Sequence, residues 1–300
     1  GTEARLLAQN RFIDKLHASG LPVPSVIATR DGVTMLHMGE VGAAEANQKA
    51  HVRVLTYLKG DIVPNKVPKS ADFLHSVGEL CGRLTCALEG FEDDAMKWDW
   101  EWNMKNVASV CTAQLKYVLD KERRAIAEKF IASYAEALNA DVIAKLPHSV
   151  IHSDLNDTNL LFRDSSVVGV LDFGDSIYSC TIFELGIAAG YYSLDQQDPL
   201  WVFAEVLRGY LTQRHLSDLE LSVFYHAAYG RVLLSVCMSA KSCAAEPDNE
   251  YLAHTSEPGW KVLQTLSSVT PDDALKHFQS IASAEKPRSC GENKRSKLDE

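Results

Sequence analysis

The 300-residue sequence lacks several features that would assign it to other classes of protein. Its seven cysteines form no C-x-x-C pair, and their odd number argues against a disulfide framework. No run of about 18 apolar residues is present, and the chain does not open on the basic and apolar regions of a signal peptide. These absences predict a cytoplasmic protein without a membrane partner.

Basic clusters are also missing. Lys and Arg number 30 against 40 Asp and Glu, the formal net charge is −10 at pH 7, and no stretch combines basic residues with interleaved aromatics. This charge argues against a nucleic-acid partner and slightly favours a cationic small-molecule substrate. With 46% apolar and 23% charged residues, the chain can bury a sizeable core in one large domain or two lobes.

Common hydrolase and nucleotide motifs are missing as well. The sequence contains no G-x-S-x-G elbow and no G-x-x-x-x-G-K-[ST] loop, which excludes a serine hydrolase of that type and a P-loop enzyme. A metal-dependent hydrolase is disfavoured because only one histidine, His152, lies inside the acidic motif of this chain.

That acidic motif is the most informative feature of the sequence. The run His152-Ser-Asp-Leu-Asn-Asp-Thr-Asn159 is followed by Asp172-Phe-Gly-Asp175, and an alternating stretch over 167–171 leads into Asp172. Phosphoryl transfer needs one carboxylate to deprotonate the attacking hydroxyl, and an amide and a second carboxylate to hold Mg²⁺ on the phosphates. We therefore predict Asp154 as the catalytic base and Asn159 and Asp172 as magnesium ligands.

Three neighbours of these residues allow more than one interpretation. We expect His152 to brace the loop by hydrogen bonds rather than to act as an acid or base. Asp157 either senses a substrate amine or remains a solvated surface group, and we expect the second role. Asp175 either senses a substrate amine or stays solvated, and the sequence does not decide between these two roles.

An unusual tryptophan cluster precedes the motif. Trp98, Trp100 and Trp102 alternate along the chain, so one face of this segment either covers a substrate ammonium by cation–π contact or packs against neighbouring helices. We keep Trp98 and Trp102 as candidate substrate contacts.

The hydrophobic pattern divides the chain into a small mixed α/β front end over 1–58, a mainly helical part over 59–284 and a disordered tail over 285–300. In the front end, a helix over 2–19 stops at Gly20, and β-rich runs cover 34–38 and 52–58 with a loop between them. Helical spacing recurs over 70–89, 109–140, 181–213, 218–244 and 257–282.

Read together, His152-x-Asp154-Leu-Asn-x-x-Asn159 and Leu171-Asp-Phe-Gly-Asp175 resemble the aminoglycoside phosphotransferase family of small-molecule kinases. The Leu155-Asn156 pair is nearer to this family than to protein kinases. Segments between about residue 5 and residue 265 are similar to the members that phosphorylate 5-hydroxylysine. These segments are Leu55 to Gly60, Trp102 to Val107, Val168 to Asp175 with Phe183-Glu184, and Pro247 to Trp260.

The resemblance implies an α+β, protein-kinase-like fold with a truncated small N-lobe and a mainly helical C-lobe. It also implies transfer of the terminal phosphate of GTP or ATP, with Mg²⁺, to the 5-hydroxyl of 5-hydroxy-L-lysine. The backbone of Leu55, Thr56 and Tyr57 would then meet the purine. Other acceptors such as choline, homoserine or an aminoglycoside stay open, because fold and motif do not choose a substrate.

Two departures from the family pattern are visible. Ser153 stands where such enzymes usually have Gly, a replacement that the loop tolerates if its backbone dihedrals are ordinary. The glycine-rich loop and the strand lysine that bind the phosphates are expected ahead of the helix over 2–19, and this sequence starts at that helix. The usual partner of that lysine is either Glu3 or the uncharged Gln9. Because these phosphate-binding elements are not in the sequence, a catalytically silent kinase-like binding protein is a second hypothesis beside the kinase.

Overall fold

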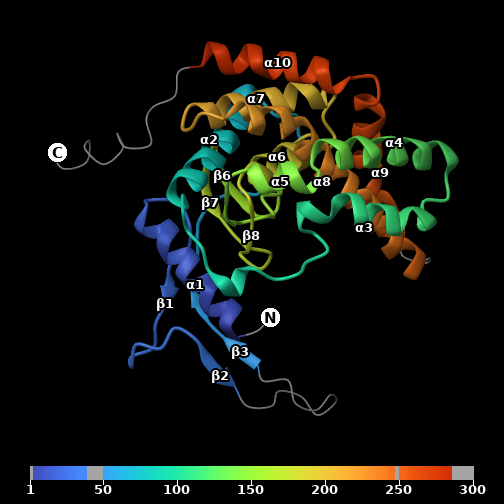
Figure 1. Ribbon diagram of the computed structural model, residues 1–300. Coiled ribbons are helices and arrows are strands. Elements are labelled where there is room, and N and C mark those ends of the chain that lie inside the picture. The colour runs from blue at the N-terminus through green and yellow to red at the C-terminus, as the bar shows by residue number, and fades with distance from the viewer. Residues whose placement is uncertain (1–2, 39–49, 247–249, 286–300) are drawn as a thin grey trace.

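The computed structural model describes residues 3–38, 50–246 and 250–285, and its N-terminal elements lie at one end of a larger helical part (Figure 1). The expected loop over 39–50 and the expected tail over 285–300 fall almost entirely outside the described residues. Strand β1 (Val26–Ile27) pairs antiparallel with β4 (Val54–Leu55), and β2 (Leu36–Met38) pairs antiparallel with β3 (Ala50–Val52). Of the β-rich run expected over 52–58, residue 52 lies in β3 and residues 54–55 lie in β4, whereas residues 56–58 are not in a strand.

Helix α1 (Glu3–Ala18) confirms the helix expected over 2–19. Its buried residues Phe12, Ile13 and Leu16 recur at helical intervals, and the helix ends where Gly20 adopts a φ of 73°. The ring of Phe12 lies 5.7 Å from that of Phe173, so α1 packs directly against the segment that contains Asp172.

The remaining helices form the larger part of the molecule. They are α2 (Ala71–Ala87), α3 (Val107–Gln114), α4 (Lys121–Ala137), α5 (Ala140–Lys145), α6 (Ile182–Tyr192), α7 (Pro199–Leu211), α8 (Asp218–Ala245), α9 (Glu250–Leu266) and α10 (Pro271–Ala284). Short 3₁₀ turns cover Asp94–Met96, Met104–Asn106 and Leu115–Tyr117. The helices expected over 109–140 and 181–213 are each divided, because Asp120 and Asp198 cap new helices within them.

Two further antiparallel pairs lie between the N-terminal elements and the helices (Figure 1). Strand β5 (His148–Ile151) pairs with β8 (Ile177–Cys180), and β6 (Leu160–Arg163) forms a hairpin with β7 (Ser166–Val170). The acidic motif occupies the connections of these strands, since His152 follows β5 and Asp172 comes two residues after β7.

Helix α8 runs through the core, and most residues between Leu221 and Met238 are buried. By length and composition it is apolar enough to cross a membrane, a feature that the sequence analysis did not single out, but 83% of its most apolar window is buried inside the protein. Arg231 is the single Arg, Lys, Asp or Glu residue of this stretch. Its position inside the core therefore needs an explanation.

Close contact between α6 and α8 sets the surroundings of Arg231. A Cβ atom at Gly190 would lie 2.5 Å from the carbonyl oxygen of Ala228, and one at Gly186 would lie 2.5 Å from the Cβ of Ala227. Only glycine permits this approach, so the two helices pack closely enough for Tyr191 on α6 to reach Arg231 on α8.

Candidate functional site

His152 joins the two halves of the acidic motif. Its imidazole is fully buried, its Nε2 donates to the carbonyl oxygen of Leu171 at 2.8 Å, and its Nδ1 accepts from the Asp154 backbone N–H at 3.3 Å. The ring also meets Phe173 edge-on, with centroids 5.0 Å apart. Because both ring nitrogens are engaged, this geometry favours the expected bracing role over direct proton transfer.

The loop after His152 is held in an unusual backbone conformation. Ser153 has a φ of 71°, in the left-handed region that favours glycine, so the condition of ordinary dihedrals under which the loop would tolerate serine is not met. The physical reason is Glu184: its carboxylate accepts from the backbone N–H groups of His152 at 2.8 Å and of Ser153 at 2.9 Å. Burial raises the pKa of Glu184, while the neighbouring His152 and these two hydrogen bonds lower it.

Asp154 lies at the centre of a hydrogen-bond network. Its Oδ2 accepts from the side-chain amides of Asn156 at 3.0 Å and of Asn159 at 2.9 Å. Its Oδ1 accepts from Arg231 Nη2 at 2.7 Å. The side chain of Asp154 remains 18% exposed, so an oriented carboxylate faces a position that an incoming hydroxyl group can reach.

Asn159 is buried and Asp172 is exposed, and a hydrogen bond fixes the orientation of each side chain. The amide nitrogen of Asn159 donates both to the Asp154 carboxylate and to its backbone carbonyl, which leaves the amide oxygen for another ligand. Asp172 is exposed, and its Oδ1 accepts from Gly174 N–H at 3.0 Å. The N–H of Leu171, the residue before Asp172, donates to the carbonyl oxygen of Asn159 at 2.8 Å. This hydrogen bond holds together the two segments that contain Asn159 and Asp172.

This donor set fits a magnesium ion. Mg²⁺ prefers oxygen ligands, and it usually binds one or two protein carboxylate or amide groups together with water and substrate phosphates. Within the described residues, no group of three or more His, Cys, Asp or Glu side chains could hold a metal by itself. Asn159 and Asp172 would supply two oxygen ligands, and the phosphates of a nucleotide would supply others.

Asp175 lies beside the same cluster and is half-buried. Burial raises its pKa, and the charge of Asp154 raises it further, while Arg231 lowers it. Such a carboxylate is stabilised in its charged form by an added cation. The sequence left a choice for Asp175, and the structure places it half-buried near Asp154, where an added cation would stabilise its charge.

Arg231 was missed by the sequence analysis. It is 2% exposed, and its Nη2 donates both to Asp154 and to the hydroxyl of Tyr191, at 2.7 Å in each case. Its guanidinium lies over two aromatic rings, 4.9 Å from the centroid of Trp102 and 4.8 Å from that of Tyr191. Burial raises the pKa of Tyr191 to about 12. The sequence signal that could have revealed Arg231 is a single arginine within the apolar stretch of α8.

The two tryptophans proposed as substrate contacts already face arginines of this chain. The guanidinium of Arg5 lies 4.0 Å from the ring centroid of Trp98, whose Nε1 donates to the carbonyl oxygen of Ser176 at 3.2 Å. Trp102 faces Arg231. One face of each ring is therefore occupied by a protein cation, which favours the packing interpretation of these residues over contact with a substrate ammonium.

Among the described residues, no hydrogen bond joins the proposed purine contacts Leu55, Thr56 and Tyr57 to the Asp154 network. The N–H of Thr56 donates to the carbonyl oxygen of Ser25 at 3.0 Å, which removes that donor from a purine contact. Leu55 is in β4, and Tyr57 is 87% exposed. Of the two candidate partners for a phosphate-binding lysine, Glu3 is exposed, whereas Gln9 is buried and donates to the carbonyl oxygen of Gly174 at 3.3 Å.

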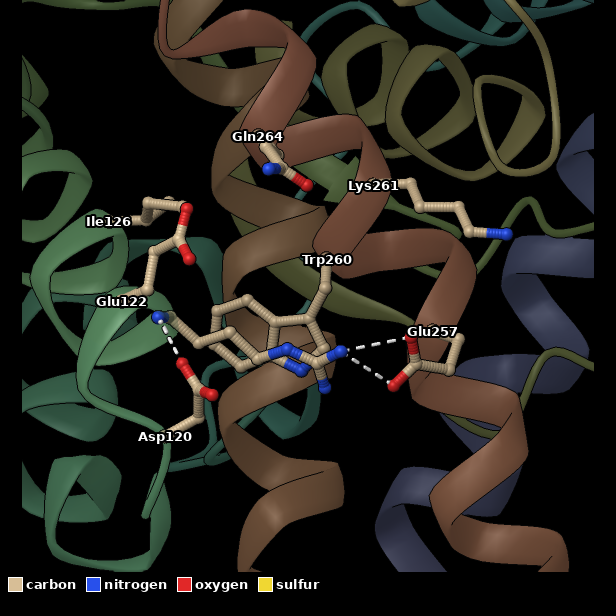
Figure 2. A pocket seen from close by; sticks show the side chains of 8 residues that line it. Asp120, Glu122, Ile126, Glu257, Trp260, Lys261 and Gln264 are labelled. Carbon is tan, nitrogen blue, oxygen red and sulfur yellow. Dashed lines mark hydrogen bonds and ion pairs between the residues drawn. The ribbon is translucent and has the colours of Figure 1, made fainter.

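A pocket elsewhere on the surface lies between α4 and α9, away from these residues (Figure 2). Its charged groups largely satisfy one another: Arg123 pairs with Glu257 at 2.8 Å and lies 5.5 Å from the ring centroid of Trp260. No residue of the acidic motif lines this pocket. We therefore assign the chemistry to the Asp154 network.

Comparison with known proteins gives a family-level match. The model of the phosphotransferase enzyme family matches residues 1–221. The mouse hydroxylysine kinase is 31% identical over 275 residues, which cover 86% of this chain and 71% of that protein. A homoserine kinase of Pseudomonas aeruginosa is 27% identical over 217 residues, covering 70% of this chain and 61% of that protein.

Solved structures show a similar fold at low sequence identity. An amicoumacin kinase in complex with AMP-PNP superposes with a TM-score of 0.63 and 16% identity, covering 92% of this chain and 81% of that one. A GDP complex of an aminoglycoside 2'-phosphotransferase gives a TM-score of 0.53 and 14% identity, with coverage of 93% and 83%. These likenesses confirm the expected α+β, kinase-like fold.

The strained backbone at Ser153 generates a stability prediction. A non-glycine residue in the left-handed region costs roughly 1–2 kcal/mol, and the greater freedom of glycine in the unfolded chain offsets about 0.5–1 kcal/mol of that. We expect Ser153→Gly to raise the free energy of unfolding by about 0.5–1 kcal/mol in urea denaturation. Ser149→Gly, in the extended strand β5, is the matched control and should lower it. Equal or lower stability of Ser153→Gly would contradict the argument.

Proposed function

Because the chain belongs to the phosphotransferase enzyme family, we propose that this alcohol-directed kinase transfers the terminal phosphate of GTP or ATP to the 5-hydroxyl of 5-hydroxy-L-lysine. The observation that carries the proposal is the Asp154 carboxylate, oriented by Arg231 and Asn159, while a backbone hydrogen bond from Leu171 to Asn159 holds the segment of Asp172 to the same loop. The choice of acceptor is supported by the similarity to hydroxylysine kinases.

Asp154 would serve as the base for the attacking hydroxyl group. Phosphoryl transfer requires little covalent chemistry from the protein, so catalysis depends on positioning and on charge stabilisation. The carboxylate accepts the hydroxyl hydrogen as the oxygen approaches the terminal phosphorus. Asn156, Asn159 and Arg231 fix its plane by hydrogen bonds, which removes the need to reorganise it in each reaction cycle.

Asn159 and Asp172 would hold Mg²⁺ on the nucleotide phosphates. When bound, the ion neutralises the charge that develops on the transferred phosphoryl group. The backbone near Leu55, Thr56 and Tyr57 would meet the purine, with the Thr56 N–H excluded because it is already used. Complexes of similar folds with AMP-PNP and with GDP are consistent with either nucleotide as the donor.

The acceptor in this proposal carries a positive charge that suits Asp175. Burial and the neighbouring Asp154 raise the pKa of Asp175, so an ammonium group placed beside it would stabilise its carboxylate. Homoserine is the second candidate acceptor, because homoserine kinases are also similar to this chain. A catalytically silent binding protein is the alternative from a different functional class.

The substrate proposal is tested by steady-state release of nucleoside diphosphate from the full-length protein with Mg²⁺. We expect 5-hydroxylysine to stimulate the release of GDP or ADP, and lysine, which lacks the hydroxyl, to be without effect. Stimulation by homoserine or choline but not by 5-hydroxylysine would reject the acceptor. A protein that binds nucleotide but responds to none of these hydroxylated amines would support the silent alternative.

Replacing the proposed base should abolish most turnover. We expect Asp154→Asn to lower kcat by a factor of roughly 10² or more, because the amide cannot accept a proton, while nucleotide binding persists. Asp157→Asn is the matched control: Asp157 accepts from the Asn65 backbone N–H at 3.0 Å, a bond that an amide oxygen preserves, so its turnover should stay at the wild-type level. Full activity of Asp154→Asn would remove this residue from the mechanism.

Loss of the proposed metal carboxylate should appear in the magnesium dependence. We expect Asp172→Asn to raise the Mg²⁺ concentration for half-maximal activity on the order of tenfold or more, because a charged oxygen ligand is lost. Asp164→Asn is a close control, since Asp164 has a φ of 56° where Asp172 has 54°, and both side chains are exposed. An unchanged Mg²⁺ requirement in Asp172→Asn would exclude Asp172 as a ligand.

A further inference from the structure

We propose that Arg231 binds a carboxylate group of the acceptor, so that the enzyme selects hydroxylated amino acids over amino alcohols that lack a carboxylate. The inference rests on the proposed function, because it needs an alcohol acceptor bound beside Asp154.

The first observation is that the donors of Arg231 are incompletely used. Although the side chain is only 2% exposed, its Nε is buried and has no hydrogen-bond partner. Its Nη1 makes one long bond, 3.4 Å, to the carbonyl oxygen of Trp102. A buried cationic donor without a partner is unfavourable, and a bound acceptor group that pairs with it gains affinity.

The second observation concerns the chemistry of that acceptor group. A guanidinium is permanently charged, and carboxylate oxygens are its usual charge-assisted acceptors. Nη2 already donates to Asp154 and to Tyr191, so a further acceptor would pair with the Nε–H. This unpartnered donor, on a guanidinium whose carbon lies 4.9 and 4.8 Å from the ring centroids of Trp102 and Tyr191, suits one carboxylate oxygen.

The third observation is the charge distribution around Arg231. The carboxylates of Asp154 and Asp175 both act on this buried cation, and an acceptor with only ammonium groups would leave the Nε donor of Arg231 unused. A zwitterionic amino acid satisfies both parts of the site, because its ammonium suits Asp175 and its carboxylate suits Arg231.

Arg231 also lies directly beside the proposed base. Its Nη2 is 2.7 Å from Asp154 Oδ1, the carboxylate proposed to receive the hydroxyl hydrogen. A hydroxyl on Asp154 and a carboxylate on Arg231 would therefore contact neighbouring residues, and 5-hydroxylysine and homoserine each carry both groups.

The experiment compares acceptors that differ only in the carboxylate. The pairs are 5-hydroxylysine with 1,5-diaminopentan-2-ol, and homoserine with 3-aminopropan-1-ol. For the wild-type enzyme, Arg231→Met and Arg231→Lys, the ratio of kcat/KM between the two members of each pair is measured on the full-length protein with Mg²⁺ and nucleotide. Any loss caused by misplacing Asp154 affects both members equally and cancels in this ratio.

We expect the wild-type enzyme to prefer the carboxylated member by roughly 10- to 100-fold, the effect of one charge-assisted hydrogen-bonded pair. In Arg231→Met the ratio should fall close to one, mainly through a higher KM for the carboxylated member, and Arg231→Lys should keep an intermediate preference. Arg123→Met is the matched control, because Arg123 also pairs with a carboxylate and lies over a tryptophan, but in the remote pocket of Figure 2. It should keep the wild-type ratio.

A wild-type enzyme that uses both members of a pair equally well would overturn the inference. So would an Arg231→Met or Arg231→Lys enzyme that is slower on both members with an unchanged ratio, because Arg231 would then only position Asp154. If Arg231→Met does not fold, the ratio in Arg231→Lys decides. Preference for homoserine over 3-aminopropan-1-ol, without activity on 5-hydroxylysine, would reject the proposed acceptor and leave the role of Arg231 supported.

Discussion

The ion pair between Asp154 and Arg231 is the interaction on which the arrangement of this site depends. It joins the loop after β5 to the long core helix α8, across 77 residues of sequence. Removing either partner would leave a largely buried charge without compensation, which typically costs several kcal/mol. Such a cost is tolerated where a protein needs a carboxylate in one fixed orientation. The close packing of α6 on α8 supports the pair, because it brings the Tyr191 hydroxyl to the same guanidinium.

A second constraint acts on the same loop from the other side. Glu184, at the start of α6, accepts from two successive backbone N–H groups and holds Ser153 in a left-handed conformation. His152 then joins this loop to the segment before Asp172. Glu184 and His152, two buried polar residues from different elements, thus help to place the proposed base and the proposed metal ligand.

Much of the site could be predicted because its chemistry is local in sequence. The spacing of Asp154, Asn159 and Asp172 is set by one loop and one hairpin, and the hydrogen bonds between Asp154 and Asn159 form within five residues. The fold class could be predicted for a similar reason, since the apolar residues of α1, α2 and α8 recur at helical intervals. Element ends were less predictable: Asp120 and Asp198 begin new helices inside stretches whose apolar pattern continues.

The sequence by itself determined the class of chemistry, the candidate base and metal ligands, and the kinase-like fold. Only the tertiary structure decided which distant groups act on them. Arg231 and Glu184 lie in apolar helical stretches, where hydrophobic periodicity describes the neighbours and says nothing about a single charge. The backbone strain at Ser153 and the arginines over Trp98 and Trp102 also depend on contacts between elements far apart in the chain. All of these features depend on packing, because packing decides which distant group lies close enough to a buried charge to compensate it.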